Sequence, residues 1–228
     1  IGLKKLAMRL AIQKASAEGW LCEHMFVMGV HNQDRTTYFT GAFPSACGKT
    51  STSMVEGETI VGDDIAYFRE IDGELRAVNV EQGIFGIIKD VNSDNDPIIY
   101  DVLTSPREVI FSNVLVSGDT PYWIGKDGEL PDKGFNYQGD WSKCLTTGDG
   151  VEVTPSHKNA RYTLRISELA NQDDRMNEPE GVPVGGIIYG GRDSDTTVPV
   201  EESFGWTHGV ITKRSEEHTS ELQSLLII

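Results

Sequence analysis

The stretch FPSACGKTS, residues 43–51, ends like a loop that binds phosphates, with Gly48-Lys49-Thr50. The common form of that loop places a glycine five residues before the Gly-Lys pair, but here the position holds Phe43. A turn that opens a helix presents backbone N–H groups to an anion. Lys49 would then meet the terminal phosphates, and Thr50 would offer a hydroxyl to a divalent cation. The alternative is a surface turn followed by a helix cap.

Acidic residues that could complete such a site follow a few residues later. Asp63 and Asp64 occur in TIVGDDIA, after an apolar run typical of a strand. A carboxylate at the end of a neighbouring strand is the second half that a nucleotide-phosphate site needs. The strand, loop and helix context together with the acid pair favours a phosphate site over a chance Gly-Lys-Thr.

Other candidate side chains are ordinary when taken singly. His24 resembles a satisfied core histidine, and Lys4 resembles a solvated lysine, because a lysine binds metal only when its amine is neutral. Arg161, in SHKNARY, and Arg192, in YGGRDS, could clamp a dicarboxylate or a phosphate. None of these four residues alone indicates a metal, phosphate or substrate site.

The elements that must position these residues form an α/β pattern with many strands. In residues 3–18, Leu3, Leu6, Ala7, Leu10 and Ala11 recur on one apolar face, and Gly19 provides a stop. We expect a helix over 48–54, a hairpin over 70–78 turning at Asp72-Gly73, and a loop-rich segment over 131–158. The other expected strands are 25–30, 36–43, 58–68, 107–116, 122–130 and 182–192.

Composition narrows the class of protein. The 228 residues carry a net charge of −15, which argues against nucleic acid as the main partner. Cys22, Cys47 and Cys144 form no CxxC pair, so neither a zinc site nor a disulfide scaffold is expected, and reduced thiols in a cytoplasm are the simpler interpretation. No apolar run approaches the roughly 18 residues of a membrane span. The missing initiator Met and the dissimilar tail RSEEHTSELQSLLII suggest a fragment with an added end.

Several segments together resemble the GTP-dependent phosphoenolpyruvate carboxykinases. They are GWLCEHMFVMGV, GAFPSACGKTS, VGDDIAYF, LRAVNVEQGIFGI, IFSNV, HKNAR, EGVPVGGIIYGGR and WTHGVI, in family order. FPSACGKT followed by GDDIA is the most specific combination, since the cysteine-containing loop is similar to the GTP-dependent class. The resemblance implies a mixed-sheet, P-loop-containing catalytic domain truncated at both ends. It covers residues 1–213 and leaves 214–228 as a tail foreign to the family, for which a short amphipathic helix is one interpretation.

The resemblance also implies roles for individual residues. The family's manganese ligands fall on Lys4, His24 and Asp64, although Leu3 replaces a second family lysine. Lys49 and Thr50 match the contacts to phosphates and to nucleotide-bound magnesium, and Asp63 matches the neighbouring acid. Further matches are Ser45, a substrate contact; Cys47, a reactive loop cysteine; Ala46, Gly48 and Ser51 in the phosphate loop; and Asn159, Arg161 and Arg192 around the substrate carboxylate and the transferring phosphoryl group.

The implied reaction converts oxaloacetate and GTP into phosphoenolpyruvate, GDP and CO2, a step of gluconeogenesis. The family enzyme is much longer, so we expect little or no turnover from this chain, exposed apolar surface, a monomer, and no membrane or nucleic-acid partner. Three alternatives stay open. They are a P-loop kinase-like module without decarboxylase activity, an inactive folded fragment, and the same reaction with ATP or pyrophosphate.

Overall fold

The computed structural model describes residues 2–43, 48–190, 200–205, 207–209 and 225–227. The chain divides into two compact units, one formed by residues 1–81 with 171–228 and the other by residues 82–170. In the described part of the chain, no helix combines the length and the apolar character that crossing a membrane requires.

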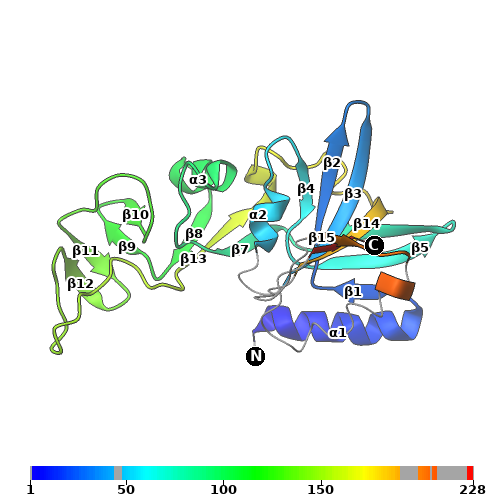
Figure 1. The fold of residues 1–228 in the computed structure, drawn as a ribbon. Helices are drawn as coiled ribbons and strands as arrows, with labels where there is room; N and C mark the ends of the chain where they lie inside the picture. Colours follow the sequence, from blue (N-terminus) through cyan, green and yellow to red (C-terminus); the bar gives the residue numbers. More distant parts are fainter. Residues whose placement is uncertain (1, 44–47, 191–199, 206, 210–224, 228) are drawn as a thin grey trace. The chain divides into compact units, whose positions relative to one another are not determined.

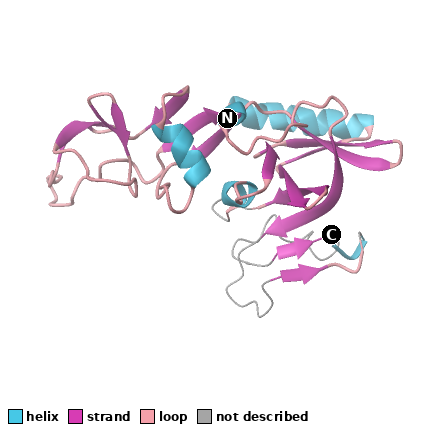
Figure 2. Ribbon diagram, turned by 90° about the horizontal axis from the view of Figure 1, so that it is seen from above, coloured by secondary structure: helices cyan, strands magenta, loops and turns pink. Residues whose placement is uncertain are grey.

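The first unit combines a mixed sheet with helices (Figures 1 and 2). Its elements are α1 (Leu3–Glu18), β1 (Leu21–Glu23), β2 (Phe26–Asn32), β3 (Arg35–Ala42), α2 (Lys49–Ser53), β4 (Thr59–Gly62), β5 (Ala66–Ile71), β6 (Glu74–Asn79), β14 (Val182–Gly190), β15 (Val200–Glu202) and β16 (Leu225–Ile227). The sheet order is β1-β5-β6-β14-β3-β2-β4, with β16 paired to both β14 and β15. The β14–β3 pair is parallel, whereas the hairpins are antiparallel, so the expected mixed α/β fold is confirmed.

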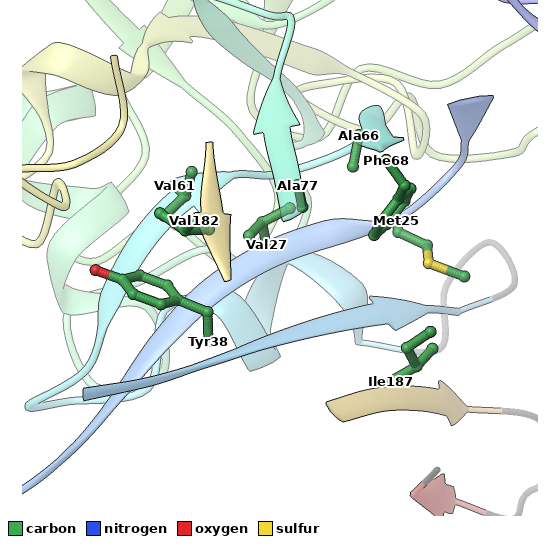
Figure 3. Packing of buried hydrophobic residues seen from close by; sticks show 9 residues of the cluster. All are labelled: Met25, Val27, Tyr38, Val61, Ala66, Phe68, Ala77, Val182 and Ile187. Atoms are coloured by element: carbon green, nitrogen blue, oxygen red, sulfur yellow. The ribbon is translucent and has the colours of Figure 1, made fainter. Parts of the chain in front are cut away.

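One buried apolar cluster of this unit packs on the curved sheet. Figure 3 shows its side chains gathered together, eight of them from strands and Met25 from the connection between β1 and β2: Met25, Val27, Tyr38, Val61, Ala66, Phe68, Ala77, Val182 and Ile187. β4 also contacts β6, although three strands separate them in the sheet order. This curvature brings the end of β4 close to the end of β6, where Gly62 lies directly against the side chain of Asn79.

Helix α1 matches its expected bounds but uses a different face for packing. Its Met8, Ala11 and Ala15 pack on Trp20, Cys22 and Ile65. The helix ends at Gly19, whose φ of 77° is the left-handed conformation that glycine adopts readily. The leucines of the expected apolar face, Leu3, Leu6 and Leu10, are exposed. Helical periodicity therefore predicted the helix correctly, but of the residues on the expected face only Ala11 packs against the core.

The second unit, residues 82–170, holds two antiparallel sheets and one α-helix. The sheets have the orders β7-β13-β8 and β10-β9-β11-β12. The elements are β7 (Gly83–Ile87), α3 (Pro97–Thr104), β8 (Val109–Ser112), β9 (Leu115–Ser117), β10 (Thr120–Tyr122), β11 (Lys133–Asn136), β12 (Gly139–Ser142), β13 (Arg161–Arg165) and the 3-10 helix η1 (Ile166–Glu168).

Several strand predictions need correction. The strand expected over 58–68 is two strands, β4 and β5, separated by a bend at Asp63 and Asp64. Residues 107–116 likewise split at Asn113, whose φ is 60°. Of the strand expected over 122–130, only Tyr122 is in a strand, and the rest forms turns in which Gly125 and Gly128 have φ values of 85° and 88°. Residues 131–158, expected to be rich in loops, contain the β11–β12 hairpin. Residues 225–227 of the tail form β16, and the rest of the predicted tail, 214–224 and 228, lies outside the described residues.

Candidate metal and phosphate site

Asp64 is the point at which side chains from separate elements meet. It lies in the bend between β4 and β5, and its side chain is 18% exposed. Lys4, from the first turn of α1, and Lys49, the first residue of α2, both place Nζ against its carboxylate. His24, between β1 and β2, places Nε2 at 2.6 Å from Asp64 Oδ1. One carboxylate therefore serves two ammonium groups and an imidazole.

The charges of this cluster shift the pKa values of its bases. Burial, followed by the nearby ammonium groups of Lys49 and Lys4, lowers the pKa of His24 to about 4. The carboxylates of Glu81 and Asp63 oppose this shift without cancelling it. Burial also lowers the pKa of Lys49 to about 8, against the attraction of Asp63. His24 is consequently neutral at pH 7, which is the form of imidazole that binds a metal ion.

Asp63 points to the buried side of the same bend and is 5% exposed. Burial raises the pKa of its carboxyl group, while Lys49 and a hydrogen bond with Thr50 oppose that rise. Its Oδ1 atom has no hydrogen-bond partner among the residues that the structure describes. A buried carboxylate oxygen in this condition has an unused capacity to accept a hydrogen bond or a cation.

The phosphate loop is described only from Gly48 onward. Gly48 has a φ of 86° and precedes α2, which contains Lys49, Thr50 and Ser51. The Thr52 hydroxyl donates to the Gly48 carbonyl at 2.8 Å and closes the first turn. The strand, loop and helix order expected from the sequence is present as β3, loop and α2. The predicted loop residues Ser45, Ala46 and Cys47 lie outside the described residues.

The predicted arginine clamp is only partly described. Arg161 begins β13 in the second unit, with its guanidinium carbon 5.2 Å from the centroid of the Phe85 ring. The backbone N–H of Asn159 donates to His157 Nδ1 at 3.0 Å. Arg192 lies outside the described residues. The roles of these residues at a substrate therefore stay predictions.

Sequence reasoning missed one member of the cluster. Glu81 follows β6, and its Oε1 lies 2.7 Å from Lys4 Nζ. Its position is set by the curvature that brings β6 towards β4, which no local sequence pattern encodes. One signal was present in the sequence. Glu81 is an acid just after β6, and β6 pairs with β5, the strand that follows the Asp63-Asp64 bend.

The donor atoms fit a divalent cation bound by mixed nitrogen and oxygen ligands. Among the described residues, no group of three or more His, Cys, Asp and Glu side chains is placed to hold a metal ion. The candidate metal ligands include a lysine amine, which lies outside those four residue types. Lys4 Nζ and His24 Nε2 both lie against the Asp64 carboxylate. Imidazole and carboxylate are usual ligands of first-row divalent metals, including Mn2+.

Comparison with known proteins gives a consistent family. The sequence profile described as "Phosphoenolpyruvate carboxykinase C-terminal P-loop domain" matches residues 20–222. The chain is 58% identical to a protein of Pyrococcus horikoshii and 57% identical to one of Pyrococcus furiosus, each over 214 residues, 93% of this chain and 34% of the relative. A relative from Chlamydia trachomatis is 37% identical over 219 residues, 92% of this chain and 35% of the relative.

All three relatives carry the name phosphoenolpyruvate carboxykinase [GTP]. The chain spans about a third of the length of these curated relatives. The matched region includes the phosphate loop, the Asp63-Asp64 bend and His24.

Proposed function

The chain belongs to the family of the phosphoenolpyruvate carboxykinase C-terminal P-loop domain, and we propose that it is the part of a GTP-dependent phosphoenolpyruvate carboxykinase that holds the metal ion and the phosphates. The complete protein would act on oxaloacetate, phosphoenolpyruvate and GTP, as the names of its relatives indicate. Since the chain spans a third of those relatives, the proposal concerns its contribution to that activity. We also propose a cytoplasmic location, because Cys22 and Cys144 are free and reduced thiols suit a reducing compartment. We further propose that the protein is a monomer.

In the proposed reaction the C3–C4 bond of oxaloacetate breaks and releases CO2. The electron pair stays on C3 and C2 as an enolate, whose oxygen attacks the γ-phosphorus of GTP while GDP leaves. Phosphoryl transfer of this kind depends on positioning and on neutralised charge, with little covalent work for the protein. The chain's cations supply that neutralisation close to Asp64.

The described residues divide this work among themselves. Lys4, His24 and Asp64 would hold a catalytic Mn2+, which when bound supplies Lewis-acid stabilisation of negative charge on the substrate oxygen. Lys49 would contact the β- and γ-phosphates with its ammonium group, and Thr50 would help to hold the Mg2+ of the nucleotide. Asp63 keeps the Thr50 hydroxyl oriented through their hydrogen bond.

The single observation that carries this proposal is the meeting of Lys4, His24 and Lys49 on one carboxylate. A nucleotide-binding module without decarboxylation would need Lys49 and an acid, but it would have no use for an imidazole and a second amine beside them. The neutral state of His24 at pH 7 supports the same interpretation.

A chimaera tests the proposal directly. Residues 2–213 replace the corresponding third of the Pyrococcus horikoshii relative, and formation of phosphoenolpyruvate from oxaloacetate and GTP is measured with Mn2+ present. We expect turnover in the chimaera and its loss in the His24→Ala and Lys49→Met variants. Lys14→Met, which removes an exposed α1 lysine paired with Glu18, is the matched control.

Two results would contradict the proposal. One is a folded chimaera that binds GTP and hydrolyses it but forms no phosphoenolpyruvate, which would favour the kinase-like alternative. The other is full activity in the His24→Ala chimaera. ATP and pyrophosphate, tested in place of GTP, report on the phosphoryl donor.

A further inference from the structure

We propose that Glu81 is a positioning residue for the metal ligand Lys4. It holds the amine of Lys4 at the cation site and adds a negative charge beside the ligands. This inference deepens the proposed function and rests on it, because it assumes that Lys4, His24 and Asp64 bind a divalent cation.

The first support is the contact itself. Lys4 Nζ lies between two carboxylates, that of Asp64 and that of Glu81, with Glu81 Oε1 at 2.7 Å. The Glu81 side chain is only 18% exposed, less than half the exposure of Lys4. Its second oxygen, Oε2, is buried and has no hydrogen-bond partner within the described residues. A carboxylate buried to this degree is costly unless cations lie close by.

The second support is that Glu81 is itself held in place. The Asn79 amide donates from Nδ2 to the Glu81 carbonyl at 2.5 Å, and the Glu81 N–H donates to Asn79 Oδ1 at 3.0 Å. Asn79 in turn packs on Gly62, where an added Cβ would come within 2.6 Å of Asn79 Oδ1. Gly62 directly precedes the Asp63-Asp64 bend. The backbone after β6 is therefore fixed against the backbone that carries the proposed metal ligand.

The chemistry of a lysine ligand explains why such a residue is needed. A neutral amine binds a metal through its lone pair and retains two N–H donors. A carboxylate that accepts from one N–H directs the lone pair, as outer partners of metal-bound histidines direct imidazoles. Lys4 also has a long, flexible side chain on the first turn of α1, so a fixed partner reduces the conformational freedom that binding would otherwise have to remove.

The test measures Mn2+ binding by the 228-residue chain, with free Mn2+ followed by electron paramagnetic resonance. We expect Glu81→Ala to weaken the affinity about 10- to 100-fold, the usual effect of removing an outer partner of a ligand. Glu81→Gln keeps an acceptor oxygen and should lose less. Glu74→Gln, on the same hairpin and paired with Arg76, is the matched control and should bind as the original chain does. Melting temperatures in EDTA report on folding without metal.

The Mn2+ affinities of the variants either support the role of Glu81 or overturn it. Weaker binding in the order Ala, then Gln, with Glu74→Gln unchanged and melting temperatures within a few degrees, supports the inference. Equal affinity of the original chain and both Glu81 variants overturns the inference and leaves the proposed function intact. Weakening that follows a loss of stability, in Glu74→Gln as well, also overturns it. No Mn2+ binding by the original chain overturns the proposed metal site together with the inference.

Discussion

Asp64 shows how a single residue can organise a site from distant parts of a sequence. Its carboxylate contacts Lys4, His24 and Lys49, which are carried by α1, by the β1–β2 connection and by α2. Three positive or potentially positive groups would repel one another in a low-dielectric environment without this carboxylate. Burial, together with the neighbouring ammonium groups, lowers the pKa of His24 to about 4 and that of Lys49 to about 8, so that the imidazole carries no charge at pH 7.

The lowered pKa of His24 predicts that the stability of the folded chain depends on pH. The pKa of His24 is about 4 in the folded chain and 6.5 in its reference state. Between these values the unfolded chain binds more protons, so His24 lowers stability as the pH falls from about 6.5 to 4. We expect the free energy of unfolding in EDTA, measured with urea, to decrease more steeply over this range in the original chain than in His24→Gln. Parallel curves for the two proteins would show that the pKa of His24 is not depressed.

The sequence predicted which residues belong to the candidate site better than it predicted which of them touch one another. The pattern FPSACGKT followed by GDDIA led to Lys49, Thr50, Asp63 and Asp64, because phosphate loops and their partner acids have a recognisable order in the chain. Lys4 and His24 came only from family resemblance. Glu81 was missed, since no short pattern connects it with Lys4, 77 positions away by residue number.

Among the elements, the close approach of β4 and β6 is what completes the cluster. Local rules predicted α1, the Asp72-Gly73 hairpin and the separate strands β2 and β3, since helical periodicity and turn chemistry are encoded locally. The same rules gave one strand over 58–68, because an apolar run does not reveal a bend that serves a site. The curvature of the sheet depends on pairings between distant segments, such as Val182 with Ala77, and lies beyond local patterns.

The approach of β4 and β6 predicts the effect of filling Gly62. In Gly62→Ala the new Cβ would meet Asn79 at 2.6–2.7 Å, which forces that side chain to move. We expect unfolding to become easier by about 1–3 kcal/mol, the usual cost of overpacking, as measured by urea denaturation. Gly2→Ala is the control, because its added Cβ meets nothing within 4 Å. A Gly62→Ala midpoint equal to that of Gly2→Ala would contradict the close packing described here.

For the whole molecule, the division into two units has a simple basis in chain connectivity. Residues 82–170 form one continuous segment whose ends meet, since β7 pairs with β13 and the Ile166 N–H donates to the Gln82 carbonyl at 3.0 Å. The segment also has its own buried cluster of Leu115, Trp141 and Val153. The Asp64 cluster belongs entirely to the other unit, which residues 1–81 and 171–228 form together.

This connectivity predicts that residues 82–170 fold when produced alone. A segment with adjacent ends and its own core meets the usual requirements of an independent unit. We expect dispersed amide signals in a proton–nitrogen NMR spectrum and a cooperative thermal transition. Signals collapsed into the range of an unfolded chain would show that the segment needs the rest of the protein for its fold.

We propose that an amine, an imidazole and a carboxylate of this chain bind one divalent cation. Pulsed electron paramagnetic resonance of Mn2+ bound to the 228-residue chain is the sharpest test of this site. We expect nitrogen couplings from an imidazole and from an amine, with the first lost in His24→Ala and the second lost in Lys4→Ala. Couplings to water protons alone, unchanged in both variants, would contradict it.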